Sequence, residues 1–402
     1  MKKEILSLFV GMLILSPISF GQGKSIHTYI CGNSLVHHTM QVNPTPSQET
    51  SAPHWMQFIA QDAGNTFEVS GNFSALPLLL SQNQIPLENN WGFDSIPGGW
   101  DSRSTSFGQS TINNVIFTPL NYLQYQPPTA NYDAGDTQNS PITAADTLID
   151  WVLDNKPGTP IYIYEGWPDM ATYTNTAFPP TQTQWQNYQA DAGYSSDFHD
   201  WFLELHDSLV NRFPNECIKM IPVGPIICEI LDRAPYNTIP IDTLYEDDAP
   251  HGRPSIYMMA GLITYMALYE ETAPATYAPP TQFIDPTIIA EYPNLVDDIW
   301  IELLNFDFFN GNSRVFCDAS VSVPKIEETQ LTIYLNPSNG DIQIETSINE
   351  GTITVQSITG QIIFQSRLES TFQLRGLSKG IYFVRVQDET EISEAIEKVI
   401  IQ

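Results

Sequence analysis

Short apolar runs alternate with amphipathic stretches along the first two thirds of the chain. The runs typical of buried strands are Ile26–Cys31, Thr66–Ser70, Asn114–Thr118, Pro160–Tyr164 and Ile218–Ile227. Apolar residues at helical spacing predict helices over His54–Ala63, Ala144–Leu153, Ser196–Asn211 and Ile256–Tyr269, the last one amphipathic and opened by Pro254. Strands that alternate with helices indicate a parallel sheet covered on both faces. We therefore expect a flavodoxin-like, three-layer α/β/α domain over residues 22–320.

The pattern changes near Thr329, where apolar and polar residues begin to alternate and no helical spacing intervenes. The strands predicted there open at Leu331 and continue as Asp341–Glu345, Gly351–Ile358, Gln361–Gln365, Thr371–Leu374, Gly380–Gln387 and Glu397–Ile401. Short strands separated by turn residues are typical of a small β-sandwich. We predict a second domain over residues 329–402, joined to the first by a linker over 321–328.

The first 21 residues have the pattern of a secretory signal peptide. A short basic start at Lys2 and Lys3 precedes an apolar stretch from Ile5 to Phe20, with small residues around a cleavage point near Gly21. The apolar stretch is short for a membrane anchor, and no later stretch is long and apolar enough to cross a bilayer. We therefore expect export, with no membrane span after cleavage.

Charge narrows the choice of partners. Lys and Arg number 16 against 46 Asp and Glu, which gives a formal net charge of −30. A surface this acidic repels nucleic acid and anionic membranes. We therefore expect neither as a partner.

The chain has four cysteines whose disulfide pairing the sequence does not determine: Cys31, Cys217, Cys228 and Cys317. An exported protein is permitted disulfides, but connectivity does not follow from sequence. A straight strand over Ile218–Ile227 would hold Cys217 and Cys228 too far apart to bond. The absence of a C-x-x-C spacing argues against a cysteine metal site.

The first predicted strand ends in Gly32-Asn33-Ser34. In open α/β sheets, ligands bind at the carboxyl ends of the strands, where this serine would be presented. Glycine allows the close backbone approach that such a turn needs. All three residue types also favour turns, so the motif taken alone is better explained as an ordinary turn.

A second polar motif lies more than two hundred residues later, at Glu246-Asp247-Asp248-Ala249-Pro250-His251. An aspartate three residues before a histidine can fold its carboxylate onto the imidazole and fix the ring's tautomer. This spacing favours Asp248 as the orienting carboxylate, with Asp247 as the competitor. A serine hydroxyl needs a base to take its proton, so Ser34 and His251 must converge if they act together.

The two motifs, in this chain order, resemble the SGNH (GDSL-like) serine hydrolases at Gly32-Asn33-Ser34-Leu35 and Asp248-Ala249-Pro250-His251, over about residues 25 to 275. The resemblance implies a serine esterase that forms an acyl-enzyme on Ser34, with His251 as general base and Asp248 as its orienter. It implies no metal and no organic cofactor. The substrate expected from the family is an ester, an O-acyl group on a polysaccharide above all.

The family's oxyanion hole is only partly matched. The resemblance assigns donors to the backbone N–H of Ser34 and to Gly71, with Gly98 or Gly99 as substitutes. The family's Gly-x-Asn-Asp block corresponds to Gly166-Trp167-Pro168-Asp169, in which proline replaces the asparagine donor. The residues considered for the missing third donor are Asn72, the Trp167 indole and Asn33.

Other side chains near these motifs are candidate pocket residues. Asn33, Asn72, Glu165 and Trp167 are predicted to contact substrate, although Glu165 could instead form a salt bridge. A glycosidase would need Glu165 and a second carboxylate at a set separation. Aromatic residues expected in loops or at strand ends, as sugar platforms or as loop packing, are Trp91, Trp100, Trp167, Trp185, Tyr164 and Tyr173. A zinc site at His37, His38 and His54 is a weaker alternative, because no helical i, i+4 histidine pair is present.

The last 75 or so residues resemble the C-terminal sorting domain of type IX secretion cargo. The matching segments are Asn336–Gly340, Ser357–Gln361, Leu377–Val386 and Lys398–Ile401. The resemblance implies the type IX secretion machinery as a partner and a secreted or cell-surface location. A generic immunoglobulin-like module would give the same fold without that role. The sequence as a whole predicts a secreted esterase, with a carbohydrate-binding or adhesion protein on a degenerate hydrolase fold as the alternative.

Overall fold

The computed structural model describes residues 23–38, 51–73, 76, 96–119, 126–132, 137–174, 177–279, 284–308 and 310–317, and in the C-terminal part 331–334, 342–346, 351–357, 362–368, 371–388 and 394–401. The predicted signal peptide, the linker, Trp91 and the Asn336–Gly340 motif lie outside these residues. The chain divides into two compact units, Met1–Cys317 and Asp318–Gln402. Each is described by itself.

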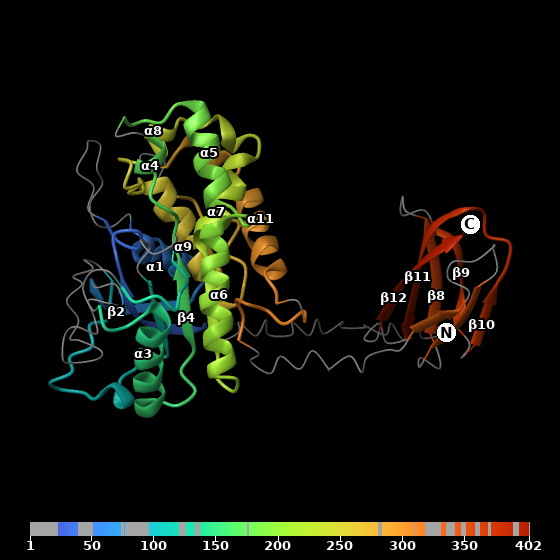
Figure 1. Cartoon of the computed structure of the whole chain (residues 1–402), viewed down its shortest axis with the longest axis horizontal. Coiled ribbons are helices and arrows are strands. Elements are labelled where there is room, and N and C mark those ends of the chain that lie inside the picture. The colour runs from blue at the N-terminus through green and yellow to red at the C-terminus, as the bar shows by residue number, and fades with distance from the viewer. Residues whose placement is uncertain are drawn as a thin grey trace, which may run out of the picture. The chain divides into compact units, whose positions relative to one another are not determined.

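The first unit is built on a five-stranded parallel sheet (Figure 1). Its strands are β1 (Ser25–Gly32), β2 (Thr66–Phe73), β3 (Asn114–Phe117), β4 (Ile161–Glu165) and β5 (Ile218–Pro222). They lie in the order β2-β1-β3-β4-β5, which is the doubly wound order in which the chain reverses direction between β1 and β3. The predicted parallel α/β sheet is therefore confirmed, and the carboxyl end of β1 lies at the switch point where ligands bind in such sheets.

Helices accompany this sheet. They are α1 (Ala52–Asp62), α3 (Pro141–Asn155), α4 (Ala171–Thr174), α5 (Gln182–Ala192), α6 (Asp197–Arg212), α7 (Val223–Asp232), α8 (Ile241–Leu244), α9 (Pro254–Tyr269), α10 (Pro286–Ala290) and α11 (Tyr292–Asn305), with 3₁₀ turns η2 (Phe107–Gln109) and η4 (Tyr236–Thr238). Helix α1 packs on α9, and α3 packs on α6. Right-handed crossovers on opposite sides of the switch point place these two pairs on opposite faces of the sheet. Among the described residues, no helix combines the length and apolar character needed to cross a bilayer.

Helix starts follow local sequence. Ser140 accepts a hydrogen bond from the backbone of Thr143 in a reciprocal capping box, with Pro141 in the first turn of α3. Ser196 caps α6 with a single hydrogen bond, which its side chain accepts from the N–H of His199. Such caps supply partners for N–H groups that a helix leaves unsatisfied at its start.

Helix α9 differs from its prediction, because every residue from Pro254 to Tyr269 is buried, so the helix is not amphipathic. A helix that is apolar on all sides belongs in the core of a larger domain. Its approach to α1 requires Gly261, where an added Cβ would lie 2.6 Å from the Cβ of Trp55.

The strand predicted over Ile218–Ile227 was too long. Strand β5 ends at Pro222 and helix α7 begins at Val223, because Pro222 and Pro225 cannot donate to a continuing ladder. Cys217 forms a disulfide with Cys317, while Cys31 and Cys228 are free and buried.

The second unit contains two antiparallel sheets. Its strands are β6 (Leu331–Tyr334), β7 (Ile342–Thr346), β8 (Gly351–Ser357), β9 (Ile362–Leu368), β10 (Thr371–Leu374), β11 (Gly380–Asp388) and β12 (Glu394–Ile401). One sheet has the order β10-β7-β6 and the other β12-β11-β8-β9. Ile342 and Ile344 of the first sheet share a core with Val355, Val384 and Val399 of the second. This unit has its own core, as the alternating pattern predicts.

Candidate active site

Ser34 lies in a tight turn just beyond β1. The Asn33 side chain accepts a hydrogen bond from the backbone N–H of Leu35 at 3.0 Å, which closes the turn. The Tyr257 hydroxyl donates to the Ser34 carbonyl at 2.6 Å, and the Tyr164 hydroxyl donates to the Leu35 carbonyl at 3.4 Å. Ser34 itself is partly exposed, whereas Leu35 is buried. Two buried tyrosines thus hold the backbone of the turn while the serine hydroxyl stays accessible.

The histidine sits in a closed loop ahead of α9. The backbone N–H of Glu246 donates to the His251 carbonyl at 2.8 Å, and Tyr245 and Gly252 form an isolated antiparallel bridge. An added Cβ at Gly252 would lie 2.8 Å from Cγ2 of Ile256. Glycine there lets the loop return close to the first turn of α9.

Ser34 and His251 converge as the sequence predicts. The Ser34 Oγ lies 3.0 Å from Nε2 of His251, and Nδ1 of the same ring lies 2.8 Å from Oδ2 of Asp247. A carboxylate can only accept, so Nδ1 carries the proton and Nε2 is left to accept from the serine hydroxyl. This is the tautomer that a general base acting on Ser34 needs.

The carboxylate that contacts the imidazole is that of Asp247, so the prediction that Asp248 reaches this ring was wrong. Oδ1 of Asp247 accepts from the N–H of Ala249 at 3.1 Å and of His251 at 3.0 Å, which turns its other oxygen toward the imidazole. The Asp248 carboxylate instead accepts from the Thr174 hydroxyl at 3.0 Å, and its carbonyl accepts from the Met170 N–H. The tight loop closes over four residues, so the side chain at the three-residue spacing faces away from the ring.

The protonation of Asp247 fits this position. Burial by itself would raise the pKa of the Asp247 carboxyl. Hydrogen bonds from the ring and backbone of His251 and from the Ala249 N–H outweigh burial and lower that pKa below its ordinary range. The carboxylate therefore stays ionised beside the imidazole, where it favours the imidazolium formed during proton transfer.

The Gly166–Asp169 block supports the histidine loop. The Trp167 indole N–H donates to the Pro250 carbonyl at 2.8 Å, which rules it out among the three candidates considered for the third oxyanion donor. Pro168 accepts from the Tyr188 hydroxyl, and Asp169 accepts from the N–H of Ala171. Trp167 is 1% exposed, which also removes it from the predicted substrate contacts.

The sheet register locates the remaining oxyanion candidates. Gly71 pairs with Ile30 and Asn72 with Cys31, since β2 continues past the predicted end at Ser70 to Phe73. Both residues therefore lie near the carboxyl end of β2. This strand pairs with one edge of β1, and β3 pairs with the other edge. Gly99 donates to Ser70 Oγ, so its N–H is directed at that buried serine and not at Ser34. Gly71 and Asn72 stay as predictions.

Glu165 is fully buried at the end of β4. Its carboxylate lies 2.8 Å from Nδ1 of His199, which is also buried. Burial raises the pKa of Glu165 to about 7, against the opposing effect of His199. The prediction that Glu165 contacts substrate was wrong, and the salt-bridge alternative holds. A carboxylate sealed in the core cannot serve as a glycosidase acid or base.

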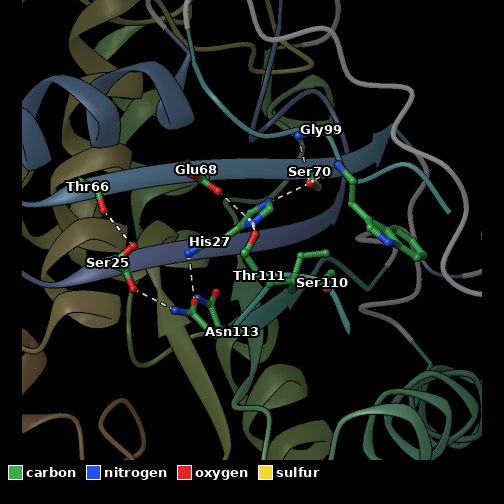
Figure 2. A network of polar contacts seen from close by, with 12 residues as sticks. Ser25, His27, Thr66, Glu68, Ser70, Gly99, Ser110, Thr111 and Asn113 are labelled. Atoms are coloured by element: carbon green, nitrogen blue, oxygen red, sulfur yellow. Dashed lines mark hydrogen bonds and ion pairs between the residues drawn. The ribbon is translucent and has the colours of Figure 1, made fainter. Parts of the chain in front are cut away.

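A second serine–histidine–carboxylate arrangement lies on β1 and β2 (Figure 2). His27 Nε2 is 2.9 Å from Ser70 Oγ, and its Nδ1 is 3.2 Å from Glu68 Oε2 and 2.6 Å from Thr111 Oγ1. Ser70 is fully buried, and its oxygen already accepts from the N–H groups of Gly99 and Trp100. The hydroxyl thus has no free approach for a substrate, and the cluster ties the loop before β3 to the sheet.

The aromatic residues considered as sugar platforms mostly pack the structure. Trp100 and Trp185 are each 7% exposed, and Tyr164 is 2% exposed. Trp185 stacks on Tyr188 and contacts Tyr245. For these residues the packing interpretation holds.

The three histidines considered as zinc ligands do not gather around one point. His37 lies beside His54, with ring centroids 6.3 Å apart, whereas His38 stacks on His251. Within the described ranges no group of three or more His, Cys, Asp or Glu side chains is arranged to hold a metal ion.

Several site residues have no clear signature in the sequence. Tyr257 lies in an apolar helix, where a tyrosine cannot be told from a core residue, and Tyr164 lies one residue before the end of a buried strand. His38 and Glu246 each neighbour a motif residue, but only the closed loop brings them together. The stretch of three acidic residues before Ala249 was the available signal for Asp247, and spacing alone chose the wrong member.

Comparisons with known proteins bear mainly on the C-terminal unit. Residues 332–402 match the family described as the secretion system C-terminal sorting domain. A search of curated proteins finds no sequence that matches the chain. Among solved structures, an essential surface component of the type IX secretion system of Porphyromonas gingivalis, PorZ, is 14% identical with a TM-score of 0.16, and the match covers 22% of this chain and 13% of that one.

Two esterases are also similar. An acetyl-xylooligosaccharide esterase from Geobacillus stearmophilus is 8% identical with a TM-score of 0.34, covering 60% of this chain and 94% of that one. A family two carbohydrate esterase from Clostridium thermocellum, in complex with cellohexaose, is 12% identical with a TM-score of 0.32, covering 60% and 64%. At these TM-scores the similarity transfers no activity. The sorting-domain match is of another kind: residues 332–402 belong to the secretion system C-terminal sorting domain family, and the chain is exported by type IX secretion to the cell surface or the extracellular space.

Proposed function

We propose that the first unit is a serine esterase of the SGNH type and that Ser34, His251 and Asp247 are its catalytic triad. The observation that carries the proposal is the chain of two contacts, 3.0 Å from Ser34 Oγ to His251 Nε2 and 2.8 Å from His251 Nδ1 to Asp247. The strand order and the position of Ser34 at the switch point support it.

In this proposal Ser34 Oγ attacks the ester carbonyl carbon while its proton passes to Nε2 of His251. The resulting imidazolium gives that proton to the leaving alcohol as the carbon–oxygen bond breaks, which leaves an acyl-enzyme. Water then attacks the acyl carbon and gives a proton to His251, and the acid departs as Ser34 recovers its proton. Asp247 holds the ring throughout and stays ionised.

The oxyanion donors in the proposal are the backbone N–H of Ser34 and Gly71, with Asn72 as the side-chain donor. The register places Asn72 opposite Cys31, near the carboxyl end of β1. One such donor is worth about 3 kcal/mol of transition-state stabilisation. Asn33 is retained as a partly exposed substrate contact beside the nucleophile.

For the substrate we propose an ester-linked acyl group on an extracellular polysaccharide. Export places the enzyme where such polymers are found, and the motifs around Ser34 and His251 resemble a family that cleaves such esters. For the second unit we propose an immunoglobulin-like sandwich, which the two sheets around one core support.

The test is hydrolysis of short-chain nitrophenyl esters and of acetylated xylan by the full chain and by Ser34→Ala. We expect turnover by the wild type and a loss of at least a thousandfold in the variant. Turnover that is equal in both proteins would exclude Ser34 as the nucleophile. No turnover by either, with retained binding to polysaccharide, would favour the carbohydrate-binding alternative.

A further inference from the structure

His38 covers one face of the candidate catalytic imidazole. The His38 and His251 rings are stacked with centroids 3.8 Å apart and planes 8° apart. The other contacts of His251 lie in the plane of its ring, toward Ser34 and Asp247. His38 therefore restricts the one motion that those in-plane contacts leave open, tilting of the ring out of their common plane.

His38 lies beside a buried carboxylate. Its Nε2 lies 3.4 Å from Oε2 of Glu246, whose side chain is 3% exposed, while the His38 side chain is 15% exposed. Asp247, in the same loop, lies close enough to act on it electrostatically, and so does His251. The adjacent residue His37 also lies near His38, and its ring neighbours that of His54 of α1.

This arrangement matters when Ser34 gives up its proton. His251 then becomes a cation, stacked directly on the His38 ring. Two like charges about 4 Å apart near a protein surface oppose each other by roughly a thousandfold in an equilibrium constant. A neutral His38 allows the imidazolium to form, and a protonated His38 opposes it.

We propose, resting on the esterase function above, that His38 is a positioning residue for His251, and that a proton on His38, held beside Glu246, turns the esterase off in acid. The stack fixes the plane of the catalytic ring when His38 is neutral. The same stack makes proton uptake by the two rings competitive, so the pair gains its second proton only at low pH.

The electrostatics of the site agree with this. Burial lowers the pKa of His38, and the neighbouring His251 lowers it further, while Glu246 and Asp247 act in the opposite direction. His38 is therefore neutral at neutral pH and takes up its proton below the ordinary histidine range. In that range the active form requires both rings to be unprotonated.

The test is the pH profile of kcat/KM between pH 4 and 8, measured on the full chain with a nitrophenyl ester. The variants are His38→Ala, the double variant His38→Phe with Glu246→Gln, and Glu246→Gln alone. The double variant keeps a ring on His251 without stranding a carboxylate against it, and the single glutamine variant controls for that second change. His37→Phe is the matched control, because His37 is the adjacent buried histidine and its ring faces His54.

We expect log kcat/KM of the wild type to fall in acid with a slope that steepens from one toward two. The double variant should keep a slope of one, and His37→Phe should keep the wild-type curve. At pH 7.5, His38→Ala should lower kcat about tenfold with KM unchanged, and the phenylalanine ring should recover most of that loss. Wild-type kcat in His38→Ala, or a slope of two in the double variant, would overturn the proposal.

Histidine-selective NMR titration separates this proposal from the esterase itself. In the wild type the His251 ring signal should show two inflections, and the double variant should abolish the second. If wild-type protein cleaves no ester while both inflections are present, the esterase function fails and the coupling stands. If esters are cleaved and His251 shows one inflection in both proteins, the proposed role of His38 fails alone.

Discussion

Replacing Asp247 by asparagine tests whether the carboxylate of the His251 loop sets the tautomer of the imidazole. Asparagine keeps one oxygen, which can still accept from the N–H groups of Ala249 and His251 and so preserve the loop. The amide nitrogen then faces His251 Nδ1 in place of Oδ2. Since an amide NH₂ only donates, Nδ1 must accept, and the ring proton moves to Nε2. A protonated Nε2 cannot take the proton of Ser34.

The magnitude follows from the position of the carboxylate. In a serine protease the same change lowers kcat by about 10⁴, because it produces the wrong tautomer. The Asp247 side chain is 41% exposed here, so water can partly solvate the imidazolium in its place. We therefore expect a loss of about 10³ in kcat, equivalent to ~4 kcal/mol of transition-state free energy.

The assay is steady-state hydrolysis of a nitrophenyl ester, with near-UV circular dichroism to show that the fold is intact. The matched control is Asp248→Asn, whose side chain contacts Thr174 and not the imidazole. It should retain kcat within about threefold. If Asp248→Asn were the more damaging of the two, the assignment of the orienting carboxylate would be refuted.

Three further outcomes are expected. Because burial raises the pKa of Glu165 from 4.5 to about 7, its ionisation costs folding free energy as pH rises through that interval. As pH rises between these two values, the unfolding free energy of Glu165→Gln should increase relative to that of the wild type by at most about 3 kcal/mol. A difference in unfolding free energy, measured by urea denaturation, that stays constant over this pH range would contradict this. Deleting residues 318–402 should leave ester hydrolysis intact, because the first unit has its own core. Cell fractionation should find the truncated protein retained in the periplasm. Loss of folding in the truncated protein would show that the two units depend on each other for stability. Gly261→Ala places a methyl group 2.6 Å from the Cβ of Trp55 and should lower the free energy of unfolding by about 1–3 kcal/mol. An unchanged melting temperature in thermal denaturation would contradict this.

Much of the first unit could be predicted because its signals are local. Buried strands such as Ile26–Cys31 are apolar runs of strand length, and turn residues end them. The error at Ile218–Ile227 arose because an apolar helix in the core and an apolar strand have the same composition. Only Pro222 and Pro225 mark the change from β5 to α7, and prolines in sequence do not say which element follows.

The sequence predicted the contact between Ser34 and His251, but not which aspartate contacts the histidine or what Trp167 binds. Ser34 and His251 lie in loops that short motifs mark in the sequence, and the structure brings their side chains to 3.0 Å of each other. The choice between Asp247 and Asp248 depends on how the loop closes, through Glu246 N–H to His251 carbonyl, which no spacing rule contains. Trp167, one of the candidates for the third oxyanion donor, is excluded for a similar reason: its indole N–H donates to a carbonyl 83 residues away in the chain.

The most direct measurement of the central claim is covalent labelling of the folded full-length protein by a fluorophosphonate, read by peptide mass spectrometry. The reagent reacts with a serine only when a neighbouring base removes its proton. Labelling should fall on Ser34 alone, be absent in Ser34→Ala and be strongly slowed in His251→Ala. Ser70, the serine of the buried cluster, should stay unlabelled. Folded protein that remains unlabelled at Ser34, or that reacts equally fast without His251, would contradict the triad.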